Sequence, residues 1–216
     1  MKPTNNHTLL RMRIFLTVLV LIFSLQSWTK ADDIRDFEIE GMSIGDSLLD
    51  YFTKNEIQRE MNSEFVYEYP GNKFIKIGVG SGKSFILTKE LDQYEDLSIA
   101  IKKNDKRYKI YSVQGRVFCM NDIQECFSKA KDIVLELKEF FGNTAKFSKW
   151  DRAHTADKSK ESHVYANEFT FKNKSKVAVH VYDWSNKLKK EKNWNDHISV
   201  AILSKEYSSF LQNIKY

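Results

Sequence analysis

Apolar residues at helical spacing predict one long helix, from about residue 122 to 141. They recur at steps of three and four, which places them on one stripe of a helix: Ile123, Cys126, Phe127, Ala130, Ile133, Val134, Leu137, Phe140 and Phe141. Asn121 followed by Gln124 is typical of a capping-box start, and Gly142 is a typical C-terminal stop. A helix with one apolar stripe is expected to pack against a sheet or another helix.

Alternating apolar and polar residues predict strands before and after this helix. Before it, the pattern predicts a hairpin with strands at residues 97–102 and 107–118 and a tight turn at Asn104 and Asp105. After it, strand patterns occupy three further segments, at residues 164–171, 177–182 and 197–203.

Shorter helices are predicted towards the two ends of this region. Residues 37–39 alternate as a short strand, Gly41 offers a turn, and residues 44–52 place apolar side chains on one helical face after a cap at Ser43. Ser204 caps a predicted short last helix. The combined pattern predicts the α+β class: a mostly antiparallel sheet, with the long helix and the shorter helices packed on one face.

Residues 1–31 have the pattern of a secretory signal peptide. Positive residues precede an apolar run of 12 residues, Ile14–Leu25, and the small residues Thr29 and Ala31 fit a signal-peptidase site. Crossing a bilayer takes about 20 apolar residues, so this run is short for an anchor. We therefore expect cleavage, a periplasmic or secreted protein and no transmembrane span after signal removal. An uncleaved anchor is the alternative.

The remaining chain, about 185 residues, suits one domain or two small ones. A polar stretch at residues 146–162 is the strongest linker candidate. It would separate an N-terminal α+β part, residues 32–145, from a strand-rich part, residues 163–216, that ends in a short helix. The two parts could equally form one domain.

Net charge argues against a nucleic-acid partner once the leader is removed. The whole chain carries a net charge of +5 and has a pI of about 9.0. Residues 1–31 hold four cations and no acid, so the mature chain carries only +1. A basic pI that depends on a discarded leader gives little support to nucleic-acid binding.

Two cysteines, Cys119 and Cys126, lie at the end of a predicted strand and in the second turn of the long helix. In an oxidising compartment we expect a disulfide, which would stabilise the fold by about 2 kcal/mol. The alternative is two buried free thiols that act as small apolar side chains.

The sequence contains no complete motif for a catalytic, cofactor or metal site. The run at Gly78–Ser84, GVGSGKS, resembles a phosphate-binding loop, but Ile77 stands where the first glycine is required, and a strand pattern follows instead of a helix. We therefore expect no bound nucleotide. His180 and His197 could converge if their strands are neighbours, but they lack the spacing of a metal motif.

A basic segment between two tryptophans is the one surface candidate for binding. Residues 185–195 are expected to form a loop, and the candidate residues are Trp184, Lys187, Lys189, Lys190, Lys192 and Trp194. Aromatic and basic groups together suit anionic lipid head groups, polyanionic glycans or an acidic partner. The alternative is a solvated loop whose tryptophans anchor it in the core.

Several segments resemble a family of small exported bacterial proteins of uncharacterised function. GMSIGDSLL at Gly41–Leu49 resembles their G-[MI]-S-x-G-D-S-L-L run after the signal peptide. Residues 108–118, the helix around Cys126 and VYDWS at Val181–Ser185 extend the resemblance over most of the mature chain. The family implies no activity. Residues 41–43 are also similar to the glycine-led helix start of BamE-type outer-membrane assembly lipoproteins, which concerns local fold only.

These observations favour an exported, noncatalytic domain that binds an envelope protein or an anionic surface component. A small periplasmic enzyme, such as a hydrolase, is the first alternative, and it predicts a cleft where His180, His197 or several carboxylates meet. A small-ligand-binding protein is the second alternative, and it predicts a deep apolar pocket.

Overall fold

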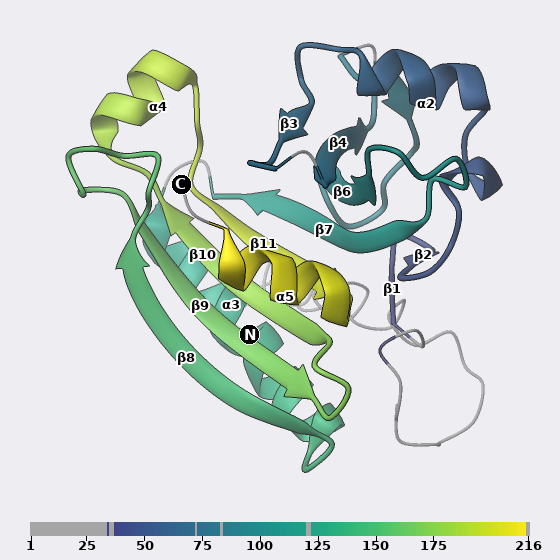
Figure 1. Cartoon of the computed structure of the whole chain (residues 1–216). Helices are drawn as coiled ribbons and strands as arrows, with labels where there is room; N and C mark the ends of the chain where they lie inside the picture. Colours follow the sequence, from purple (N-terminus) through teal and green to yellow (C-terminus); the bar gives the residue numbers. More distant parts are fainter. Residues whose placement is uncertain (1–33, 35–36, 72, 83, 120–121, 215–216) are drawn as a thin grey trace, which may run out of the picture.

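The computed structural model describes residue 34 and residues 37–71, 73–82, 84–119 and 122–214 (Figure 1). The predicted signal peptide, residues 1–31, lies outside the described residues. One nine-stranded sheet organises the fold, in the order β3-β4-β6-β7-β11-β10-β9-β8, with β5 beside β4. All neighbouring strands on this path are antiparallel, and only β4 and β5 pair in parallel.

The strands of this sheet are β3 (Tyr67–Glu68), β4 (Phe74–Gly80), β5 (Leu87–Thr88), β6 (Asp96–Lys102), β7 (Ile110–Phe118), β8 (Ala145–Ala153), β9 (His163–Phe171), β10 (Lys176–Asp183) and β11 (His197–Leu203). The helices are α2 (Lys54–Met61), α3 (Ile123–Phe141), α4 (Asn186–Lys192) and α5 (Lys205–Asn213). A small separate pair, β1 (Glu38–Ile39) and β2 (Met42–Ser43), opens the described chain.

The long helix and the α+β class are confirmed. The N-cap of α3 is Asp122, whose side chain accepts from the N–H of Gln124 at 2.8 Å; Asn121, where the sequence placed a capping box, lies outside the described residues. Gly142, with a φ of 48°, is the C-cap, as expected. The predicted stripe is formed by the buried residues of α3, which are Cys126, Ala130, Val134, Leu137 and Phe141. This stripe packs on β10 and β11, so the main core lies between α3 and the sheet.

α5 lies on the opposite face of the sheet from α3, which differs from the expectation that the helices share one face (Figure 1). The ring of Tyr207 in α5 lies 5.2 Å from that of Phe74, in a second small core with Tyr111. Ser204 caps α5 as predicted. α5 therefore covers apolar residues of β4, β6 and β7 on one face, whereas α3 covers β10 and β11 on the other.

The predicted helix over residues 44–52 is wrong. Ser43 belongs to β2, and only a 3-10 turn, Leu48–Asp50, forms after a cap at Ser47. Gly45 has a φ of 104°, a left-handed conformation that interrupts a right-handed helix. The helix of this region is instead α2, which begins after a capping box between Thr53 and Glu56.

The expected polar linker, residues 146–162, is largely an edge strand. Its first half belongs to β8, which pairs with β9 over its full length, and the remainder is the turn into β9. An edge strand exposes much of its surface, which gives it a polar composition like that of a linker. Because β7 pairs with β11, the two expected parts also share one sheet.

Candidate functional site

A chain of aromatic and imidazole rings lies on the face of β10 and β11 that is turned away from α3. We call it the aromatic cluster, and its members are Trp150, His154, His180, Tyr182, Trp184, Trp194 and His197. The pairing of β10 with β11 decides which of these rings are neighbours. Tyr182 lies opposite His197 across β10 and β11, so their side chains share a face. Alternate residues such as Val179 and Val181 point to the core under α3.

The rings contact one another without a break. The Tyr182 and His197 rings stack with centroids 4.6 Å apart and planes at 11°. Trp184 continues the row, with its ring centroid 4.4 Å from Trp194 and 4.6 Å from His154. Contacts of this kind add to the stability obtained from burial. Most of these rings remain half-buried, so they offer partial faces to a ligand.

Trp150 joins the cluster from the edge of the sheet. It lies opposite Ala166 of β9, and Ala166 lies opposite His180 of β10. Because alanine is small, the Trp150 and His180 rings reach across it, with centroids 5.5 Å apart. Trp150 was not among the candidate residues expected from the sequence, because it lies in the segment that was expected to be a linker. The alternation of Trp150 with exposed Lys149 and Asp151 was the available signal.

The segment between the tryptophans is a helix, which corrects the expectation of a loop at residues 185–195. Ser185 caps α4 by accepting from the N–H of Leu188 at 3.4 Å, and Leu188 is buried beneath the helix. Asn193 ends α4 in the left-handed conformation, with a φ of 54°. Two turns of helix are too short for the period of the sequence to predict them.

Asp196 holds α4 against the sheet. One of its carboxylate oxygens accepts from the N–H of Trp184 at 2.8 Å, and the other lies 2.6 Å from Nζ of Lys189. Trp184 is buried and Trp194 is half-buried, so these two rings anchor the ends of the segment in the fold. The anchoring tryptophans of the alternative interpretation are therefore present.

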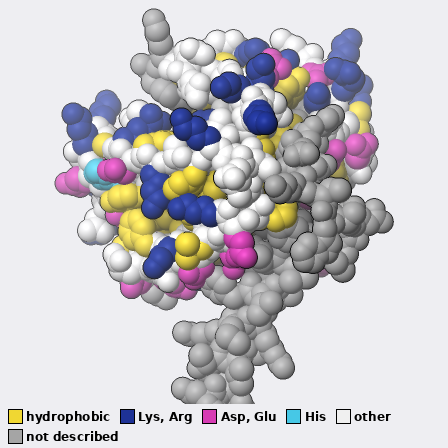
Figure 2. All heavy atoms as spheres, turned by 90° about the horizontal axis from the view of Figure 1, so that it is seen from below, with side chains coloured by type: hydrophobic (Ala, Val, Ile, Leu, Met, Phe, Trp, Pro, Cys, Tyr) yellow, Lys and Arg dark blue, Asp and Glu magenta, His cyan; other side chains and the backbone are white. Residues whose placement is uncertain are grey.

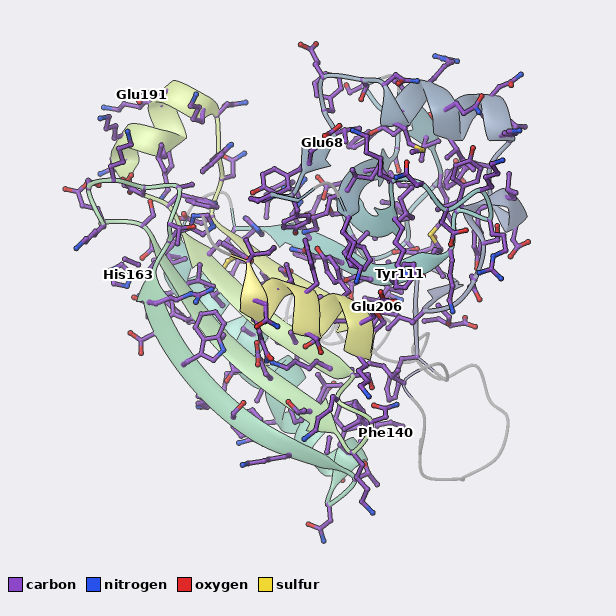
Figure 3. The ribbon with its side chains drawn as sticks, viewed as in Figure 1. Glu68, Tyr111, Phe140, His163, Glu191 and Glu206 are labelled. Atoms are coloured by element: carbon purple, nitrogen blue, oxygen red, sulfur yellow. A yellow bond between two sulfur atoms is a disulfide. The ribbon has the colours of Figure 1, made fainter. Side chains whose placement is uncertain are left out.

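The other three candidate cations remain accessible. Lys187, Lys190 and Lys192 are exposed on α4, and none of them takes part in an ion pair with another described residue. Lys189 is the exception because Asp196 neutralises it. Three exposed lysines beside the aromatic cluster give this end of the molecule a local excess of positive charge, which attracts anions. α4 stands at the upper left in Figure 3, where Glu191 is labelled.

Burial keeps two imidazoles of the cluster neutral at pH 7. It lowers the pKa of His197 to about 4, against the ordinary value of 6.5. It also lowers the pKa of His154. The cluster is therefore an uncharged aromatic surface at these two rings, and the positive charge beside it comes from α4.

His180 and His197 lie on neighbouring strands and on one face, as their positions in the sequence allowed, but their side chains do not bond to each other. His180 is opposite Ser199, and no hydrogen bond among the described residues joins the two side chains. Its Nε2 lies 3.8 Å from a carboxylate oxygen of Glu168. Within the described ranges there is no group of three or more His, Cys, Asp or Glu placed to hold a metal ion.

The carboxylate of Glu168 is ionised and forms an ion pair with Lys176. Its carboxylate lies 2.6 Å from Nζ of Lys176. Burial by itself would raise the pKa of Glu168, but the hydrogen-bonded ammonium group of Lys176 and the nearby His180 imidazole outweigh it and lower the pKa to about 2. A carboxylate that stays ionised at neutral pH does not supply the proton that a general acid needs.

Two clefts in the described chain are open to solvent and lined mostly by polar and charged residues. One, of about 400 Å³, is lined by Lys73, Lys102, Asn104, Asp105, Arg107 and Tyr111. Glu206 lies 2.9 Å from Lys73 and 3.0 Å from Lys102, so two of the cations that line this cleft are paired. Glu206 and Tyr111 lie near each other in Figure 3. The other, of about 150 Å³, is lined by acidic residues such as Glu40, which accepts from two backbone N–H groups. Neither resembles a deep apolar pocket.

The disulfide prediction is confirmed. Cys119 follows β7 and is bonded to Cys126 in α3, with their Cα atoms 5.8 Å apart. The N–H of Cys119 also donates to the carbonyl of Asp196 at 2.9 Å. The bridge therefore connects the end of β7 to the start of α3, next to the residue that anchors α4.

The glycines of the GVGSGKS run have a packing explanation. A Cβ added to Gly80 would lie 2.4 Å from the ring of Phe85, so the absence of a side chain lets this ring cross β4. Gly82 has a φ of 90°, which favours glycine. Lys83 lies outside the described residues. The run leads into a turn and the short strand β5, with no helix after it.

No protein-family model, curated protein or solved structure matches this chain. Among the helices in the described ranges, none has both the length and the apolar character needed to cross a lipid bilayer.

Proposed function

We propose that this chain is an exported, noncatalytic binding domain of the cell envelope, and that it recognises an anionic glycan. The observation that carries the proposal is the continuous aromatic cluster beside the exposed lysines of α4. Partly exposed ring faces suit the apolar C–H faces of sugar rings, and lysine ammonium groups suit carboxylates or phosphates. Trp194, Lys187, Lys190 and Lys192 are the accessible residues of this surface.

A glycan fits this surface better than a lipid bilayer does. Helices and loops that insert into a bilayer present exposed apolar side chains beside their cations. Here the rings are half-buried or buried and pack against one another, and the backbone N–H of Trp184 donates to Asp196. A rigid aromatic surface loses little conformational entropy when a sugar stacks on it.

Export is supported by two features. The N-terminal 31 residues have the pattern of a signal peptide. The Cys119–Cys126 disulfide is consistent with an oxidising compartment. Mass spectrometry of the native protein from a fractionated cell should find it outside the cytosol with Asp32 at its N-terminus. A cytosolic protein that retains Met1 would overturn this part of the proposal.

Glycan binding is tested by titration calorimetry with oligosaccharides of uronic acids and with neutral oligosaccharides of the same length. We expect the acidic series to bind more tightly, and the reversal Lys187→Glu, Lys190→Glu, Lys192→Glu to weaken binding at least tenfold. Trp194→Ala should weaken binding of both series, because it removes a stacking face. Binding should also fall as salt rises, since exposed charges are screened.

The matched control reverses three exposed lysines elsewhere, at Lys131, Lys172 and Lys174. It changes the net charge by the same amount and should leave glycan affinity within about twofold. Equal loss in both triple variants would mean that net charge, and not the α4 surface, attracts the ligand. Binding to vesicles of anionic lipid without binding to acidic glycans would also refute the proposal.

A further inference from the structure

The outer edge of β8 is an unpaired strand edge of unusual length. β8 has nine residues and pairs only with β9, whereas the opposite end of the sheet is the two-residue strand β3 (Figure 1). Proteins commonly shorten, cover or bend an edge strand, because its free N–H and C=O groups are a template for another strand. β8 is long, and no described segment pairs with its outer side.

The strand pairing identifies which groups of β8 point outwards. His154 donates its N–H to the carbonyl of Ser162 at 2.8 Å, directly after the last pair of β8 with β9. Hydrogen-bonded and non-hydrogen-bonded residues alternate in an antiparallel ladder, so the even-numbered residues of β8 bond to β9. The odd-numbered residues Phe147, Lys149 and Asp151 therefore direct their backbone N–H and C=O groups away from the sheet.

We propose that a second copy of this chain pairs antiparallel with β8, about a two-fold axis at Trp150. In this register Lys149 lies opposite Asp151 of the second copy, and Asp151 lies opposite Lys149 of the second copy. The outward backbone groups of these residues meet, as an antiparallel ladder requires. The surface is thus self-complementary, which a two-fold interface requires.

The side chains of these two residues are available for such a pairing. Lys149 and Asp151 are both exposed, and neither forms an ion pair with another described residue. Both side chains lie on the face of β8 that is turned towards α3, as does Phe147. Nζ of Lys138 lies over the Phe147 ring, 4.0 Å from its centroid. Figure 2 shows Lys and Arg side chains beside apolar ones on the face seen from below.

On the opposite face of the strand, the same axis brings Trp150 of one copy against Trp150 of the other. This position is a non-hydrogen-bonded pair in the proposed ladder, where side chains approach most closely. Arg152 already lies over the Trp150 ring, with its guanidinium carbon 4.6 Å from the ring centroid. Paired aromatic rings flanked by arginine are typical of the centre of a protein interface.

Neighbouring registers are less favourable. An axis at Lys149 would set Lys149 against its own copy and Arg152 against Lys146, which are like charges. An axis at Asp151 would set Asp151 against its own copy. Registers that pair odd with even residues would bring outward backbone groups against inward ones, so the ladder could not form. An acidic peptide could use the cations of β8, but Asp151 at the centre of the edge would oppose it.

The dimer is tested by sedimentation equilibrium of the full chain over a wide concentration range. We expect the native chain to dimerise. Lys149→Asp or Asp151→Lys alone turns two attractive cross-strand pairs into two repulsive ones, and should raise the dimer dissociation constant about tenfold or more. The double change, Lys149→Asp with Asp151→Lys, restores both ion pairs and should return the constant to within about threefold of the native value.

The matched control exchanges an exposed pair on α3, Lys131→Asp with Asp132→Lys, and should leave the dimer unchanged. A chain that stays monomeric at all concentrations would overturn the proposal, whether or not it binds an acidic peptide along β8. A dimer that is insensitive to the single changes would also overturn it. None of these substitutions touches α4 or Trp194, so this proposal can fail independently of glycan binding.

Cysteine substitutions test the register separately. At Trp150→Cys the two new thiols lie on the axis and should form a disulfide-linked dimer on oxidation. At Lys149→Cys the thiols would face Asp151 of the second copy and should not cross-link. Efficient cross-linking at position 149 with none at 150 would show that the axis lies elsewhere and would refute this register.

Discussion

His197 allows the sharpest test of the aromatic cluster, because its burial makes folding sensitive to pH. The side chain is only 5% exposed, and Nδ1 lies 2.9 Å from the carbonyl oxygen of Asn195. Burial, with lesser effects from Arg116 and Lys76, lowers the pKa to about 4, and the contacts with Asn195 and Asp196 only partly offset it. We therefore expect acidification to unfold the protein through this residue.

The sign and size of the effect follow from proton linkage. The unfolded chain binds a proton at His197 with a pKa of about 6.5, well above the folded value of about 4. Between these two values the unfolded state holds more protons, so the free energy of unfolding decreases as pH falls. The expected loss from this residue is about 2 kcal/mol between pH 7 and pH 5, and about 3 kcal/mol once the pH is below 4.

The assay is urea unfolding followed by circular dichroism at pH 7 and pH 5, for the native chain and for His197→Phe. Phenylalanine keeps a ring against Tyr182 and removes the titrating nitrogen atoms. The native chain should lose about 2 kcal/mol more than the variant between the two pH values. Other titrating groups, including His154, contribute equally to both proteins and cancel in the comparison. Equal pH dependence would refute the argument, because it would mean that folding does not perturb this imidazole.

Three further changes test the core and the bridge. Leu137→Ala should lower the free energy of unfolding by about 3 kcal/mol in urea titrations, because it leaves a cavity under the sheet; a loss below about 1 kcal/mol would place α3 elsewhere. Replacing Cys119 and Cys126 with serine should cost about 2 kcal/mol, and a reductant should then affect only the native chain. Gly115→Ala places a Cβ 2.4 Å from the Tyr94 ring and should cost about 1 to 3 kcal/mol. A double-mutant cycle with Tyr94→Ala should recover part of that cost, and strict additivity would count against the contact.

Elements with a strong local pattern were predictable. The 19 residues of α3 carry more than four turns of apolar stripe, and Gly142 ends the helix as the sequence indicates. The hairpin of β6 and β7 was also predicted, although β7 begins at Ile110, later than the predicted strand. Long periodic segments are the most reliable for prediction because many positions agree.

Short and edge elements were not predictable in the same way. The polar residues of α2 carry a weak apolar signal, and the seven residues of α4 span only two turns. β8 was taken for a linker because an edge strand exposes much of its surface and is therefore rich in polar residues. The partly buried ion pair of Arg116 with Asp96 depends on register between β6 and β7, which sequence does not specify.

The sequence by itself determined the α+β class, the long helix and its C-terminal end, and the placing of two cysteines where a strand end meets a helix start. These follow from residues close together in the chain, whose spacing sets which side chains share a face. Only the tertiary structure decided that Trp150, Tyr182 and His197 form one cluster, that α5 covers the opposite face, and that β8 is the edge of the sheet among the described residues. These depend on which strands become neighbours and in what register, and that choice results from packing the whole core.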